Sequence, residues 1–135
     1  MKRSSPRRVV RQLALDRACV IREDGEEYCI YPLDDVLAVL GKKWALFIVS
    51  VLGNERKARF RDLRRSLLGI SPRILTDRLR ELEEIGLVRR AAFAGISAGG
   101  AYALTEDGRR MRRALIPFLR WSIDFETARR GLEGP

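Results

Sequence analysis

Apolar residues recur at helical spacing over most of the chain. From position 33 onward, apolar positions three or four residues apart predict helices over 33–40, 44–52, 60–68, 71–85 and 105–129. Glycine directly follows each of the first four segments, and glycine commonly ends helices because it adopts left-handed backbone conformations without strain. Two β-rich runs, 87–93 and 101–104, lie between the fourth and fifth helices and are joined by a loop over 94–100.

The first 31 residues follow a different pattern. Residues 1–8 are a basic arm, 9–18 predict a short helix, and two β-rich runs flank Asp24-Gly25, a dipeptide typical of tight hairpin turns. The pattern therefore predicts three parts. They are 1–31 (basic arm, short helix and β-hairpin), 32–104 (the domain that holds the DNA-binding motif described next) and 105–135 (a C-terminal helix, for which the resemblance given below implies dimerisation).

The third and fourth helices have the spacing of a helix-turn-helix. Only the short turn Gly69-Ile70-Ser71 separates them, and two short helices joined by a tight glycine-containing turn are typical of this motif. The two strands that follow suit the wing of a winged helix. The predicted fold class is mainly α with a small β wing (α+β), a winged helix-turn-helix. That it is dimerised through terminal helices is what the family resemblance given below implies.

The helix over 71–85 has the features of a recognition helix. Ser71 is a preferred N-cap, Pro72 is tolerated at the first helical position, and an apolar stripe faces inward. In helix-turn-helix proteins the first half of this helix contacts base edges, where Arg grips guanine, Thr meets the thymine methyl and Asp accepts from cytosine. The residues predicted to contact bases are Arg73, Thr76, Asp77 and Arg80.

The net charge favours a polyanionic partner. Lys+Arg number 27 against 18 Asp+Glu, which gives +9, and 23 of the cations are Arg. Such a basic balance indicates nucleic acid first, and double-stranded DNA fits the helix-turn-helix. The residues predicted to contact phosphate are Lys42, Lys43, Arg61, Arg64, Arg65, Ser71, Arg89 and Arg90.

The composition argues against an enzyme. The chain has no His, which excludes Ser-His-Asp and Cys-His catalysis and every His-containing metal site, and its two Cys are too few for a four-thiolate zinc site. We expect no cofactor and no metal. No apolar run approaches the roughly 20 residues that span a bilayer, and the basic N-terminus is not followed by an unbroken signal-like run. We therefore expect a cytoplasmic protein with no membrane partner.

Five segments together resemble a known family. The residues are CIYPL at 29–33, GKKWALFI at 41–48, FRDLRR at 60–65, GISPRILTDRLRELEEIGLV at 69–88 and YALTEDG at 102–108. They are similar to the HxlR-type branch of the MarR-like winged-helix transcription regulators, and the resemblance spans about residues 29–125. It implies a homodimeric, sequence-specific regulator with the helix Ser71–Ile85 in the major groove. On the same ground, a small-molecule effector is a candidate partner.

The last helix is apolar on more than one face, which agrees with the dimer that the resemblance implies. A helix of this kind must bury against something. A partner subunit is one explanation, and tight packing within the chain is the other. The residues predicted at the dimer interface are Leu115, Phe118, Leu119, Trp121 and Phe125.

The sequence departs from the family pattern at its cysteines, wing and N-terminus. The resemblance implies a Cys just before Pro32, where Tyr31 stands, and Cys29 comes two residues early. Cys29 is a candidate redox sensor, with inert thiols as the alternative. A disulfide with Cys19 would need a three-residue hairpin loop, because a two-residue turn pairs position 20 with 29. The wing tip is small and uncharged, and the N-terminal extension of roughly 28 residues has no counterpart in the family. Its basic arm is either a contact to phosphate or a minor groove, or a disordered tail.

Two other functions remain open at this stage. A non-specific architectural protein would bind DNA or RNA through charge alone, with steep salt dependence and no sequence preference. A winged-helix protein-interaction module would use the basic surface on an acidic protein partner instead.

Overall fold

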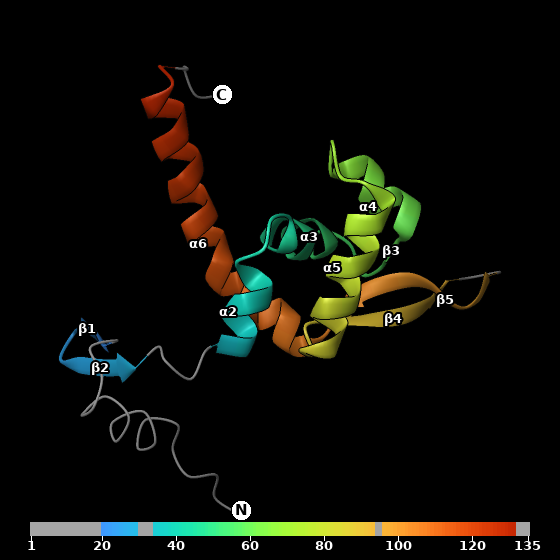
Figure 1. Cartoon of the computed structure of the whole chain (residues 1–135), viewed down its shortest axis with the longest axis horizontal. Helices are drawn as coiled ribbons and strands as arrows, with labels where there is room; N and C mark the ends of the chain where they lie inside the picture. Colours follow the sequence, from blue (N-terminus) through green and yellow to red (C-terminus); the bar gives the residue numbers. More distant parts are fainter. Residues whose placement is uncertain (1–19, 30–33, 94–95, 132–135) are drawn as a thin grey trace, which may run out of the picture. The chain divides into compact units, whose positions relative to one another are not determined.

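The computed structural model describes residues 20–29, 34–93 and 96–131 (Figure 1). The chain divides into two compact units, 1–38 and 39–135, and each is considered by itself. The helix predicted over 9–18 lies outside the described residues.

The first unit contains a β-hairpin. Strand β1 (Val20–Glu23) pairs antiparallel with β2 (Glu26–Cys29). Asp24 (φ 51°) and Gly25 (φ 76°) both occupy the left-handed region, as a two-residue turn between twisted strands requires. The register places Val20 opposite Cys29. A Cys19–Cys29 bridge within this hairpin needed the three-residue loop instead, and Cys19 itself lies outside the described residues.

The helices form where apolar spacing predicts them. They are α2 (Asp34–Leu40), α3 (Ala45–Leu52), α4 (Phe60–Ser66), α5 (Pro72–Glu84) and α6 (Glu106–Arg129). Trp44 precedes α3 with φ 82°, an unusual conformation for a bulky residue. Within the part of the chain that the structure describes, no helix combines the length and the apolar character needed to cross a lipid bilayer.

The wing is larger than the sequence pattern predicts. Strands β3 (Ala58–Arg59), β4 (Val88–Phe93) and β5 (Ile96–Leu104) form an antiparallel sheet in the order β3-β5-β4. The expected loop over 94–100 is wrong in extent, because β5 begins at Ile96 and pairs it with Phe93 across a register irregularity. The short strand β3 was not predicted, since two residues cannot display an alternating pattern.

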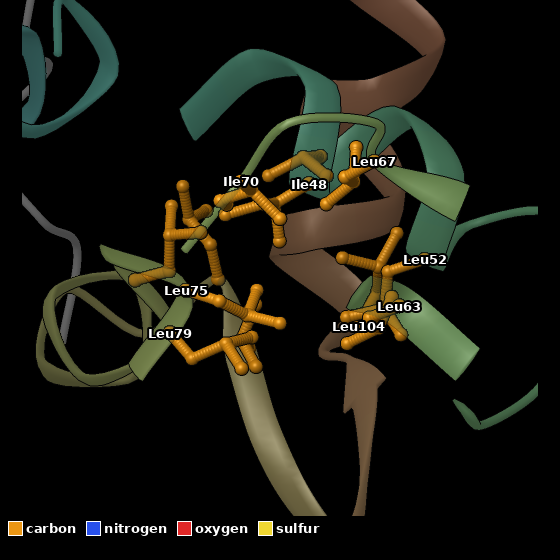
Figure 2. Packing of buried hydrophobic residues seen from close by; sticks show 12 residues of the cluster. Ile48, Leu52, Leu63, Leu67, Ile70, Leu75, Leu79 and Leu104 are labelled. Carbon is orange, nitrogen blue, oxygen red and sulfur yellow. The ribbon is translucent and has the colours of Figure 1, made fainter. Parts of the chain in front are cut away.

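Apolar side chains from α3, α4, α5, β4 and β5 of the second unit meet in one core, and Met111 of α6 packs against it. Figure 2 shows Leu75 and Leu79 of α5 close to Ile70 of the preceding turn, with side chains from α3, α4 and β5 completing the cluster. Leu75 and Leu79 are fully buried. The apolar stripe of α5 therefore anchors this helix to the core, and the opposite face of α5 is exposed to solvent.

The start of α6 is fastened to the end of the helix-turn-helix. Thr105 caps α6 by accepting from the Gly108 amide at 3.0 Å, and its hydroxyl donates to the carbonyl of Gly86 at 2.6 Å. A Cβ on Gly108 would lie only 2.1 Å from the Leu87 carbonyl oxygen, so only glycine fits there. Further along, Pro117 lies inside α6, where it removes one helical hydrogen bond.

Candidate nucleic-acid interface

The first turn of α5 is built as an N-terminal cap. The Ser71 hydroxyl accepts from the Ile74 amide at 3.1 Å, and Pro72 occupies the first helical position, where no amide hydrogen is needed. The cap leaves other amides of the first turn at the positive end of the helix dipole. Ser71 is itself exposed, which suits an approach by phosphate.

The four residues predicted to read bases share the solvent face of α5. This face lies opposite the buried stripe; three of the four side chains are exposed, and Asp77 is half-buried. Thr76 donates its hydroxyl hydrogen to the Pro72 carbonyl at 2.8 Å. That bond leaves its methyl group and oxygen lone pairs for an external contact.

Asp77 and Arg80 are bonded to each other. Arg80 Nη2 donates to Asp77 Oδ1 at 2.7 Å, one helical turn away. The sequence pattern treats the two as independent readers, whereas the structure joins them in one unit with no net charge.

Five of the predicted DNA contacts are exposed arginines that have no ion-pair or hydrogen-bond partner among the described residues. Three project from α4, one from the first turn of α5 and one from β4. They are Arg61, Arg64, Arg65, Arg73 and Arg89. The elements that carry them pack into one core, and their free, exposed guanidinium groups are suited to phosphate.

Lys42 is already engaged in an ion pair. Its Nζ lies 3.1 Å from Glu81 Oε1, and Arg78 Nη1 lies 3.1 Å from the same oxygen. Arg78 also donates from Nε to the carbonyl of Lys43 at 3.0 Å. This network ties the middle of α5 to the segment before α3, so Lys42 offers less free positive charge than its position in the sequence suggests. Lys43 remains exposed, with its Nζ 5.4 Å from the Trp44 ring centre.

Arg90 is likewise engaged. Its Nε lies 3.5 Å from Glu83 Oε2, and its guanidinium lies 5.8 Å from the ring centre of Tyr102 on the neighbouring strand. Sequence analysis missed two further cations at the wing. Lys57 donates to the Ala92 carbonyl at 2.6 Å, and Lys57 and Arg59 both approach the Phe93 ring, so these contacts link the β3 side of the sheet to β4 across the intervening β5. Contacts between residues this far apart in the sequence leave no local pattern from which they could be predicted.

The residues predicted at the dimer interface fall into two groups. Leu115 is buried by residues of this same chain and offers almost no surface to a partner, and Leu119 is half-buried. Phe118, Trp121 and Phe125 are each about half exposed or more and form a stack, with ring centres 6.2 and 5.1 Å apart. In Figure 1 this C-terminal half of α6 extends beyond α3.

A groove of about 380 Å³ lies between the start of α3 and this part of α6. Trp44, Phe47 and Phe118 give it aromatic walls, and Lys42 and Lys43 lie at its edge. The aromatic surface of α6 therefore continues onto α3.

Comparison with known proteins shows to which family the chain belongs. Residues 39–129 match the model of the HxlR-like helix-turn-helix family. The chain belongs to the HxlR family. Its relatives carry the names of transcription regulators and not of enzymes, and this HxlR-family protein is a DNA-binding transcription regulator.

Three relatives illustrate the similarity. The chain is 31% identical over 116 residues to the HTH-type transcriptional regulator YdeP of Bacillus subtilis, covering 86% of this chain and 85% of YdeP. A possible HxlR family transcriptional factor from Thermoplasma volcanium is 38% identical with a TM-score of 0.71, covering 79% of this chain and 95% of that one. The reduced form of the transcriptional regulator YodB from B. subtilis is 27% identical with a TM-score of 0.59, covering 70% and 92%. YodB is also known in diamide-treated and quinone-bound forms.

Proposed function

We propose that this HxlR-family protein binds a specific double-stranded DNA sequence as a homodimer, with α5 in the major groove. The observation that carries the proposal is the exposed polar face at the start of α5, set on a buried leucine stripe. A helix held in this way presents its N-terminal residues to base edges while the protein remains rigid.

Base contacts fall to Arg73, Thr76 and Arg80, with Asp77 acting beside Arg80. Arg73 carries no ion pair within the described residues and lies in the first turn of α5, where a bidentate grip on guanine is geometrically suited. Phosphate contacts are assigned first to the free arginines of α4 and to Arg89. Ser71 and Lys43 supply further phosphate contacts. Lys42 and Arg90 also contact phosphate, once their ion pairs with Glu81 and Glu83 have broken.

The homodimer is proposed to form through the segment 105–135, chiefly through α6. Support comes from the stacked surface of Phe118, Trp121 and Phe125, whose exposure is costly unless another molecule covers it. Symmetric dimers are the commonest oligomers, and a two-fold axis would set two α5 helices about 34–36 Å apart, one turn of DNA.

The decisive experiment is a selection from random duplexes followed by titration. The selected duplex and a shuffled version are compared by fluorescence anisotropy at about 150 mM salt, where non-specific binding is typically about 10⁻⁴–10⁻⁶ M. We expect a preference of roughly 10³ or more for the selected duplex. Equal binding to both with steep salt dependence would favour the architectural function, and no binding at all would favour the protein-interaction module.

A matched pair of variants tests the base contact. Arg73→Ala should weaken binding to the selected duplex by about 1–3 kcal/mol and binding to the shuffled duplex much less. Arg120→Ala, an equal charge change at an exposed site on α6, should leave the ratio of the two affinities unchanged. An equal loss on both duplexes for Arg73→Ala would remove it from base readout.

Regulation by oxidation or by a small molecule is a further proposal. The quinone-bound and diamide-treated forms belong to YodB. In this chain Cys29, the last residue of β2, is the candidate thiol. Binding of the selected duplex before and after treatment with an oxidant, in the wild type and in Cys29→Ser, tests it. Loss of binding only in the wild type is the expected result.

A further inference from the structure

The bonded pair Asp77–Arg80 stands out on the face of α5 that the proposed function turns toward DNA. The 2.7 Å separation makes it the shortest ion pair recorded between described residues. Asp77 is also the only acidic residue between positions 71 and 80. A carboxylate in this position would repel phosphate unless a cation neutralises it.

Protein stability does not account for the pair. Exposed ion pairs one turn apart on a helix add little to folding, and Arg80 is 64% exposed. Other such pairs occur on this chain, among them Asp107 with Arg110 at the start of α6, at 3.6 Å. What distinguishes Asp77–Arg80 is its place among the candidate base contacts.

The pair changes what Arg80 does in two ways. Its charge is balanced by Asp77, so it adds little to the sequence-independent attraction for phosphate that the free Arg73 and the α4 arginines supply. Its guanidinium is also held at one end, because Nη2 is bonded to Asp77, while its other N–H groups remain available. A rigid donor loses less freedom when it meets a matching acceptor pair.

We propose that Asp77 is a positioning residue for specificity, holding Arg80 so that it binds the O6/N7 edge of a guanine and not phosphate. This inference rests on the proposed function. It differs from the simpler assignment, in which Asp77 itself accepts a hydrogen bond from cytosine. In our proposal Asp77 acts only through Arg80.

A double-mutant cycle tests the proposal. The wild type, Asp77→Ala, Arg80→Ala and the double variant are titrated against the selected duplex, the shuffled duplex and a panel with each base pair changed in turn. Asp107→Ala is the matched control, because it removes the same charge from a similar pair far along the chain. Thermal unfolding of each variant confirms that the fold is kept.

We expect Arg80→Ala to reduce the preference for one guanine roughly tenfold. Asp77→Ala should flatten the preference at that same base pair. It should also bind the shuffled duplex more tightly and steepen the dependence of log affinity on log salt by about one unit, because Arg80 becomes free for phosphate. The double variant should have the base profile of Arg80→Ala, and Asp107→Ala the base profile and salt dependence of the wild type.

Other outcomes would overturn the proposal in distinguishable ways. Asp77→Ala could instead abolish the preference at a different base pair, and do so also in the Arg80→Ala background. That result would make Asp77 a direct reader of the base. An unchanged profile in Asp77→Ala would make the pair a solvated surface contact. A wild type without any preferred duplex would instead overturn the proposed function itself, and this inference with it.

Discussion

The helices α5 and α6 treat their apolar residues in opposite ways. In α5 the stripe Leu75, Leu79 and Leu82 is fully buried, and the exposed face is polar. In α6 the first half packs on the protein, but Phe118 and Trp121 in the second half remain more than half exposed. One protomer completes the packing of α5 and does not complete that of α6. The apolar residues of α5 are thus buried when the chain folds. Those in the second half of α6 are, in our proposal, buried when two chains assemble.

The largest effect is expected from truncating the buried stripe. Leu79→Ala removes a fully buried side chain and should lower the free energy of unfolding by about 2–5 kcal/mol. Leu68→Ala, at a position that is 87% exposed, is the control and should change it by less than about 0.5 kcal/mol. Urea denaturation followed by circular dichroism measures both. Similar losses for the two variants would contradict the packing of α5.

Trp121→Ala should act on assembly instead. We expect it to weaken the proposed dimer by about 2 kcal/mol or more, since a central Trp commonly dominates an interface. Its melting temperature should fall only at protein concentrations where the wild type is dimeric. Ile123→Ala removes another exposed apolar side chain about 200° around the helix and should have a much smaller effect.

Analytical ultracentrifugation measures the dissociation constants of both variants. If Trp121→Ala and the wild type dimerise equally well, the α6 surface has another purpose and the contrast between the helices loses its explanation.

The two helix caps offer a comparison of intermediate size. Ser71→Ala removes one capping bond at α5 and should cost about 1 kcal/mol. Thr105→Ala at α6 removes the capping bond and the hydrogen bond to the Gly86 carbonyl, so about 2 kcal/mol is expected. Chemical denaturation measures the free energy of unfolding of both variants. A larger decrease for Ser71→Ala than for Thr105→Ala would show that the cap of α5 contributes more to stability than the cap of α6.

The smallest effect is expected from removing one exposed arginine, either from α4 in the helix-turn-helix or from α6. Arg64→Ala on α4 should reduce the slope of log affinity against log salt by about one unit, because a phosphate contact is lost. Arg120→Ala on α6 should leave that slope unchanged. A salt titration with any duplex measures both, and equal slopes for the two variants would exclude Arg64 from phosphate contact.

The main elements of the fold could be predicted because each carries a local signal. The helix spacing, the Ser71-Pro72 start and the Asp24-Gly25 turn all correspond to elements of the structure. Strand β3 carries no such signal, because Ala58 and Arg59 are too few to show a period. The early start of β5 was missed because small residues and glycines in 94–100 resemble a loop.

The candidate site was less accessible to sequence analysis. Identity and spacing select the cations but do not reveal which carboxylate each one meets. Asp77 and Arg80 are one turn apart, so their contact could have been inferred from helical geometry. The contact of Lys42 with Glu81 depends on tertiary packing over a long separation in sequence, and so could not be inferred.

Pro117 divides the packed half of α6 from the exposed half. Without an amide hydrogen there, the carbonyl four residues earlier lacks its helical partner, and the helix bends more easily at this point than elsewhere. The 12 residues that follow Pro117 in α6 extend about 18 Å, so a bend of about 10° displaces the far end by about 3 Å. In the proposed dimer joined along this arm, such a bend would let the separation of the two α5 helices vary by a few ångströms, and with it the spacing of the half-sites that one protein could bind.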